Sequence, residues 1–92
     1  MDREVRNSQV RVKILEFIID YTSRRGYPPS YRDMQDGVGI VASAVKRHIK
    51  YLIDARVIAQ DLGKARSIRI ADADLARRFI SRNSVGGNDG SR

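Results

Sequence analysis

The segment Gly26-Tyr27-Pro28-Pro29 limits what the chain can fold into more than any other feature of the sequence. Proline has no amide proton to donate within a helix, and it disfavours helical backbone at the residue before it, so an extended linker is predicted here. Upstream, apolar residues recur at spacings of three and four, which predicts one amphipathic helix. This helix begins at Asn7 or Ser8 and ends near Arg25, and its apolar positions are Val10, Ile14, Leu15, Phe17, Ile18 and Tyr21.

Two further helices are predicted after the linker. Ser30-Tyr31-Arg32-Asp33 has the form of a capping box with aspartate in the fourth position, and the short helix that it starts ends at Gly37-Val38-Gly39. The third helix begins between Val41 and Ser43, where Ser43 could act as the N-cap, and it runs to about Ala55. Its buried stripe consists of Val45, Ile49, Leu52 and Ile53, and its wet side carries Lys46, Arg47, Lys50 and Asp54.

The rest of the chain predicts a β-hairpin and a short helix. Residues 57–60 and 67–70 are rich in β-branched residues and are predicted to be strands, joined by a loop that contains Gly63. The order helix, helix, helix, strand, strand is that of a winged helix-turn-helix, mainly α with a two-stranded wing. We therefore expect a flexible N-terminus in residues 1–7, the winged helix in 8–71, a C-terminal helix turn or two within 72–82, and a disordered tail in 83–92.

Length and composition exclude most other classes of protein. A chain of 92 residues can bury one compact core and leaves no room for a second domain. With no cysteine and one histidine, neither a disulfide framework nor a multi-histidine metal site is expected, and no cofactor is predicted. No apolar run approaches the length of a membrane span and the charged start is unlike a signal peptide, which predicts a cytoplasmic, nucleoid-associated location. The net charge of +7 favours an anionic partner.

Residues 41–70 concentrate positive charge on the third helix and the hairpin. Seven Lys/Arg stand against two acids, Asp54 and Asp61; the basic residues are Lys46, Arg47, Lys50, Arg56, Lys64, Arg66 and Arg69. A helix and a hairpin that share a positive face suit the phosphate backbone of a duplex, and arginine can donate two hydrogen bonds to guanine in the major groove. The alternative interpretation of the helix residues is a solvated helix face that has no partner. The alternative for the loop residues is that their charge only makes the protein more soluble.

The middle of the chain resembles the DNA-binding domain of the LexA repressor family over roughly Ser8 to Ala71. The most specific part runs from Arg25 to Met34 and is similar to the family's Gly-apolar-Pro-Pro-Ser/Thr segment. The Val38-Gly39-Ile40 turn, the run from His48 to Leu52 and the strand start Val57-Ile58 also fit the family. The resemblance implies a third helix that lies in the major groove and a wing that reaches the backbone or the minor groove.

Carried over by position, the resemblance implies which side chains contact DNA. The base-reading residues would be Ser43, Ala44, Lys46 and Arg47, with Lys50 one turn further on. Lys64 and Arg66 would contact the backbone or minor groove, and Tyr31 and Arg32 a phosphate at the start of the second helix. Two features depart from the family. The turn before the third helix is one residue shorter, and the self-cleaving C-terminal domain has no room, so we expect neither self-cleavage nor its route to dimers.

These observations favour a sequence-specific double-stranded DNA-binding protein, a transcriptional repressor or regulator that could bind a two-half-site operator as a homodimer. The alternative is a protein-interaction module or a phage- or plasmid-type accessory factor, in which Leu75, Phe79 and Ile80 contact a partner. An enzyme and a small-molecule substrate are not expected, because no acid, base, nucleophile or metal-ligand cluster is evident. The sole histidine, His48, is expected to be half-buried with its hydrogen bonds satisfied.

Overall fold

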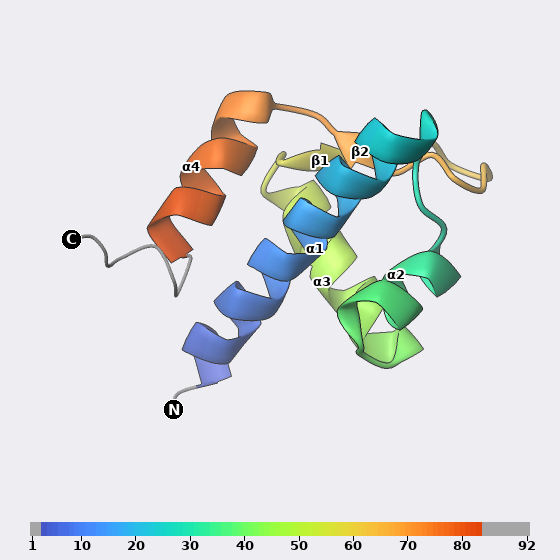
Figure 1. Cartoon of the computed structure of the whole chain (residues 1–92). Helices are drawn as coiled ribbons and strands as arrows, with labels where there is room; N and C mark the ends of the chain where they lie inside the picture. The colour runs from blue at the N-terminus through green and yellow to red at the C-terminus, as the bar shows by residue number, and fades with distance from the viewer. Residues whose placement is uncertain (1–2, 84–92) are drawn as a thin grey trace.

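The computed structural model describes residues 3–83 and confirms the winged-helix order. Its elements are α1 (Arg3–Arg25), α2 (Tyr31–Val38), α3 (Ala42–Asp54), β1 (Ile58–Ala59), β2 (Arg69–Ile70) and α4 (Ala73–Asn83). The helix α1 runs through the middle of the domain, and α4 and α2 lie on opposite sides of it (Figure 1). Met1, Asp2 and residues 84–92 of the predicted tail lie outside the described residues, and Asn83 is the last residue of α4.

The helix α1 begins at Arg3, earlier than the predicted start at Asn7 or Ser8. Residues 3–6 are exposed, so they add nothing to the buried stripe on which the prediction relied. They can still extend the helix, because arginine and glutamate are good helix formers and Glu4 lies in the first turn, where a negative charge is favourable.

One hydrophobic core joins α1, α2, α3 and the hairpin. The residues that are almost fully buried include Ile14, Leu15, Ile18, Met34, Val45, Ile49, Leu52, Ile58 and Ile68. At Gly37 the helix α2 lies against Phe17 of α1 so closely that an added Cβ would be 2.1 Å from the ring. The predicted stripes of the first and third helices therefore point into the same core, with Phe17 and Ile53 partly buried at its edge.

The start of α2 has the predicted capping box. The Asp33 amide donates to Ser30 Oγ at 3.0 Å, and the Ser30 amide donates to Asp33 Oδ2 at 2.9 Å. The helix ends at Gly39, whose φ of 82° is left-handed. The chain then enters α3 directly, because Val41 is already the N-cap residue.

The prediction that Ser43 could cap α3 is wrong. Val41 occupies the N-cap position and makes no side-chain capping bond, and Ser43 is an exposed residue within the first turn. The shortened turn after Gly39 moves the start of the helix toward the N-terminus of the chain, which places Ser43 two residues after the N-cap position.

The end of α3 leads into a strained residue, Arg56, whose φ is 66°. A residue with a Cβ adopts this left-handed backbone only at a free-energy cost, whereas glycine adopts it without that cost. We therefore expect Arg56→Gly to raise the free energy of unfolding by up to about 1 kcal/mol, measured by urea denaturation. Arg56→Ala removes the same charge but keeps the Cβ, so it should bring no gain. Equal stability of the two variants would contradict this explanation.

The hairpin is antiparallel, and Ile58 pairs with Ile70 and Ala59 with Arg69. Both strands are shorter than the predicted ranges 57–60 and 67–70. The buried Ser67 explains the difference, because its hydroxyl bonds to the loop itself instead of extending the ladder. It accepts from the Asp61 amide, and its single proton is shared between the carbonyls of Lys64 at 2.9 Å and Asp61 at 3.2 Å. Residues 60–68, here called the wing loop, are thus held by side-chain bonds.

The helix α4 starts with a side-chain cap at Asp72. The Leu75 amide donates to Asp72 Oδ1 at 3.0 Å, and the Ala76 amide donates to the Asp72 carbonyl. Ala76 is buried, and Leu75, Phe79 and Ile80 are partly buried against the core. The apolar residues that could have bound a partner therefore contribute much of their surface to the domain's own packing.

Candidate nucleic-acid interface

The exposed side of α3 carries the predicted basic residues. At 100° per residue, Ser43, Arg47 and Lys50 follow one line along the helix, and Lys46 flanks it. Lys46 and Arg47 are exposed and form no ion pair with any residue in the range 3–83, whereas Lys50 Nζ lies 3.3 Å from Asp54 Oδ2. The two cations nearest the start of the helix therefore point into solvent without a counter-charge in the described part of the chain.

The orientation of this face is set by the opposite side of α3. Val45, Ile49 and Leu52 are at most 1% exposed, so the helix cannot rotate without moving apolar surface into water. Ala44 is half-buried at the edge of the face, close to the exposed Ser43. The structure thus brings together, on one face of α3, the five helix residues that were predicted to contact DNA: Ser43, Ala44, Lys46, Arg47 and Lys50.

A buried polar cluster behind this face was not predicted. His48 is 2% exposed, and its Nδ1 accepts a hydrogen bond of 3.2 Å from Nε of Arg11, which is itself only 5% exposed. The Arg11 guanidinium carbon lies 3.5 Å from the centroid of the Tyr51 ring. Burial, followed by the charges of Arg47 and Arg11, lowers the pKa of His48 to about 4. The histidine is therefore neutral near pH 7 and accepts a hydrogen bond, and it is more deeply buried than the half-buried state that was predicted.

Arg11 lies on the buried stripe of α1, four residues before Leu15 and seven before Ile18. That spacing was visible in the sequence, but an arginine at such a position is usually exposed. Its Nη1 has no hydrogen-bond partner among the described residues and is 3.8 Å from Glu4 Oε2. A buried N–H group without a hydrogen bond is unusual, and the Tyr51 ring and the ion pair with Glu4 supply part of the compensation.

The wing brings a second set of predicted residues to the surface. Lys64 is exposed near the tip of the wing loop and has no ion pair within residues 3–83. Arg69 is paired instead, with its Nη1 3.1 Å from Asp61 Oδ1. Lys64 therefore has its charge free of an acidic neighbour in the described residues, whereas the charge of Arg69 is partly balanced by Asp61.

Arg66 does not project from the wing as expected. Its φ is 53°, and its Nη1 donates to the Tyr21 hydroxyl, the Pro28 carbonyl and Asp33 Oδ2 at 3.0–3.2 Å. The guanidinium also lies 5.1 Å from the centroid of the exposed Tyr27 ring. Arg66 therefore fastens the wing loop to the end of α1, the linker and the start of α2, a set of contacts called here the wing clamp.

The carboxylate of the wing clamp is held in its charged form. The pKa of Asp33 is lowered to about 2, first by the hydrogen bond from the Ser30 amide, and further by the hydroxyls of Tyr21 and Ser30 and by the charge of Arg66. The residue that caps α2 thus also anchors the wing.

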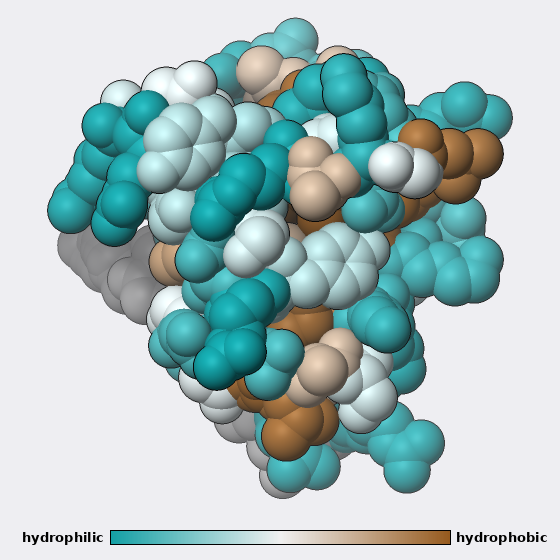
Figure 2. All heavy atoms as spheres, turned by 90° about the vertical axis from the view of Figure 1, so that its right-hand side faces the viewer, coloured by the Kyte–Doolittle hydropathy of each residue, from teal (hydrophilic) through white to brown (hydrophobic). Residues whose placement is uncertain are grey.

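The two predicted residues of α2 make contacts of their own. The Tyr31 hydroxyl donates to Gln60 Oε1 at 3.1 Å, which links α2 to the wing loop, and Arg32 is exposed and 3.8 Å from Asp36. Figure 2 views the side of the domain from which the wing loop projects, and hydrophilic residues cover most of it, with hydrophobic residues in separate small patches.

Other kinds of site find little support in the described residues. Within the range 3–83, no group of three or more His, Cys, Asp or Glu side chains could hold a metal ion. None of the helices in that range combines the length and the apolar character needed to cross a membrane.

Comparison with known proteins identifies the family. The chain is similar to LexA repressors: it is 38% identical over 71 residues to that of Geobacillus thermodenitrificans, and 37% and 34% identical over 67 residues to those of Desulfitobacterium hafniense and Clostridium perfringens. The matches cover 72–76% of this chain but only 33–34% of the relatives, so the chain spans about a third of their length. A family model, the LexA DNA binding domain, matches residues 7–67. This chain, with a winged helix and a basic third helix, belongs to the LexA DNA-binding domain family.

Proposed function

We propose that this protein binds double-stranded DNA in a sequence-specific manner and acts as a transcriptional repressor, at the nucleoid in the cytoplasm. The observation that carries the proposal is the pair of exposed cations, Lys46 and Arg47, on α3 opposite a fully buried stripe. Membership in the LexA DNA-binding domain family supports it. The names of the similar proteins, LexA repressors, support the regulatory role.

The proposed binding mode places α3 in the major groove. Arg47 can donate two hydrogen bonds to O6 and N7 of a guanine, and Lys46 and Lys50 can contact neighbouring base edges or phosphates. Ser43 and Ala44 lie in the first turn, where the serine hydroxyl can bond to a base or phosphate and the alanine methyl can contact a thymine methyl group. The buried stripe holds all of these groups in one orientation, which is what selection among bases requires.

Contacts to the backbone are proposed for the wing and for α2. Lys64 can reach a phosphate from the wing loop without breaking an ion pair. The bonds of Arg66 to the domain all use Nη1, so Nη2 can donate to a phosphate while the wing clamp stays intact. Tyr31 and Arg32 at the start of α2 stand where the first helix of a helix-turn-helix meets the backbone.

A salt titration tests the electrostatic part of this proposal. Each phosphate contact by a cation should add about −0.9 to the slope of log affinity against log salt. We expect a steep slope for the wild type, and Lys64→Ala should reduce its magnitude by about 1 with little change in the preferred sequence. Fluorescence anisotropy with a labelled duplex measures both. Arg78→Ala, which removes an exposed charge from α4, serves as the control and should leave the slope unchanged. A flat salt response of the wild type would contradict the binding mode.

We further propose that two copies bind two half-sites. One domain of this size offers a small interface to DNA, and two-fold symmetric operators are a common way to double it. Selection of bound duplexes from a random pool tests this, because a dimer on two half-sites should recover a palindromic sequence. A single, asymmetric site would show that one copy binds alone.

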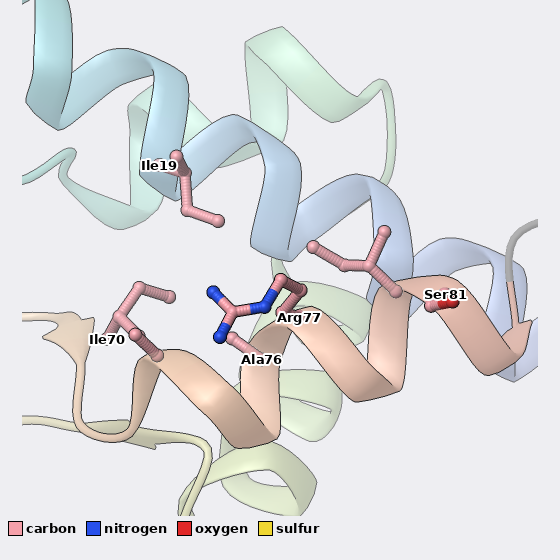
Figure 3. Close-up of a pocket in the computed structure, with 7 residues that line it drawn as sticks. Ile19, Ile70, Ala76, Arg77 and Ser81 are labelled. Atoms are coloured by element: carbon pink, nitrogen blue, oxygen red, sulfur yellow. The ribbon is translucent and has the colours of Figure 1, made fainter.

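A second candidate function, docking of a protein partner, is favoured by one feature. A groove of about 480 Å³ lies between α1 and α4 and is lined by Ile19, Ile70, Ala73, Ala76, Arg77, Ile80 and Ser81. Figure 3 shows that Ile19 and Ile70 border this space and that the Arg77 side chain extends into it. Arg77 also pairs with Asp74, so the groove offers apolar surface rather than a basic face. A folded protein that fails to shift any duplex in a mobility assay would favour this function over DNA binding.

A further inference from the structure

Leu62 is the most exposed large hydrophobic residue in the described part of the chain. Its exposed fraction is 99%, compared with 66% for Val41 and 42–44% for the other large apolar residues on the surface. Single exposed apolar side chains are common on soluble proteins and need no explanation in general. This leucine is different because of where it lies, at the tip of the wing loop beside Lys64, which has no ion pair within residues 3–83.

The tip that carries Leu62 is held rigidly. The Lys64 amide donates to the Asp61 carbonyl at 3.3 Å and closes a turn with Leu62 and Gly63 at its centre. The φ of 72° at Gly63 matches the glycine position of such a turn. Ser67 ties both ends of the turn together, and the wing clamp fastens the loop to the rest of the domain. The leucine side chain is therefore presented at a fixed place.

Neither packing nor turn geometry requires leucine at this position. The side chain makes no contribution to the core, because it is almost fully accessible to water. The special backbone of the turn falls on Gly63, and the position before it commonly holds proline rather than an apolar side chain of any particular shape. A polar residue would satisfy the fold equally well and would be more soluble, so the leucine points to a contact outside the chain.

We propose that Leu62 is the side chain with which the wing enters the minor groove of bound DNA, between the sugar walls, while Lys64 contacts a flanking phosphate. This inference rests on the proposed DNA binding. The minor groove is about 6 Å wide and admits the tip of a hairpin but not a helix. Minor-groove binders frequently insert apolar side chains such as leucine from the groove as wedges against the base steps.

With Leu62 in the minor groove, the wing distinguishes A·T pairs from G·C pairs. In the minor groove a G·C pair differs from an A·T pair by the guanine N2 amino group, which protrudes from the groove floor. An apolar tip cannot accept a hydrogen bond from that amino group and would leave it unpaired. The wing of this protein therefore prefers A·T pairs at the position that Leu62 reaches, independently of what α3 reads in the major groove.

Base analogues separate the two grooves in a direct test. The duplex selected from a random pool is synthesised with 2,6-diaminopurine in place of adenine at one A·T pair at a time, which adds an amino group to the minor groove and leaves the major-groove edge unchanged. We expect the affinity of the wild type, measured by anisotropy, to fall several-fold when the analogue occupies one of the one or two base pairs that the wing contacts. Leu62→Ala should lose about tenfold in affinity for the unmodified duplex and should no longer respond to the analogue.

Leu62→Ser serves as a second variant and Arg78→Ala as the control on α4. Because Leu62 is exposed, neither of its variants should change the thermal midpoint, so a loss of binding cannot be attributed to unfolding. Unchanged affinity of Leu62→Ala, or an equal response of wild type and Leu62→Ser to the analogue, would overturn the proposal. In both cases Arg47→Ala would still weaken binding if the proposed function holds. Absence of DNA binding by the wild type would instead contradict the proposed function itself.

Discussion

Replacing Arg47 by alanine is expected to weaken binding to the preferred duplex by about 1–3 kcal/mol, or roughly 5- to 150-fold in Kd. Arg47 is exposed near the start of α3 and has no counter-charge within residues 3–83, so its guanidinium is available to a guanine edge. The loss should be selective. Binding to duplexes that lack the preferred base should change little, and a repeated selection should recover sequences that are relaxed at one position.

The matched controls for this variant distinguish base reading from charge. Arg78→Ala removes the same side chain from the exposed side of α4 and should leave the affinity within a factor of two or so. Arg47→Lys keeps the charge but loses the planar fork, so it should retain non-specific affinity and lose discrimination. A variant Arg47→Ala that binds all duplexes more weakly by the same factor would show that Arg47 contacts a phosphate and does not read a base.

Much of the fold could be predicted because its signals are local. The capping box at Ser30 needs only four consecutive residues, and it has the expected pair of hydrogen bonds. The buried stripe of α3 follows from spacings of three and four, and Val45, Ile49 and Leu52 are all buried. The reliance on local apolar spacing also explains why the start of α1 was predicted too late. The first turn of α1 is exposed and buries nothing, so apolar spacing gives no sign of a helix that begins at Arg3.

The inward contacts of Arg66 could not be predicted, because they join distant parts of the chain. Arg66 bonds to Tyr21, Pro28 and Asp33, which are 33 to 45 residues away in sequence, and nothing near Arg66 indicates that its side chain turns inward. Its left-handed backbone is equally invisible in the sequence, because such strain is tolerated only where surrounding contacts enforce it. Residues of the candidate interface could thus be located on their elements, but their availability to DNA could not be judged.

The interface gains its rigidity from the contacts that the sequence did not reveal. The wing clamp uses the carboxylate that also caps α2, so the wing loop and the helix-turn-helix share one anchor, Asp33. Behind α3, Arg11 bonds to His48 and stacks on Tyr51, which ties the third helix to α1. Recognition of a base sequence depends on the separation of the groups that read it, and both ties fix that separation.

The stability of the domain is expected to fall as the pH is lowered from 6.5 to 4, by about 3 kcal/mol in total. The cause is His48, whose pKa is lowered from 6.5 to about 4 by burial and by the charges of Arg47 and Arg11. Below pH 6.5 the unfolded chain binds a proton at this residue and the folded chain does not, so the unfolded state is favoured. The stabilisation is complete above pH 6.5, and it has been lost once the pH reaches the folded pKa. Because His48 is the only histidine, no other side chain ordinarily titrates near pH 6.

Urea denaturation at pH steps between 7.5 and 4 measures this effect, and His48→Gln is the matched control. Glutamine does not titrate, but its side-chain oxygen can still accept the hydrogen bond from Arg11 Nε, so the variant should fold and its stability should be nearly flat between pH 6.5 and 5. A further loss below pH 4 should persist in both proteins, since the pKa of Asp33 is lowered from 3.8 to about 2 and protonation there breaks the wing clamp. Parallel stability curves for wild type and His48→Gln between pH 6.5 and 5 would show that His48 is protonated in the folded domain, and that the buried tie between α1 and α3 does not hold it neutral.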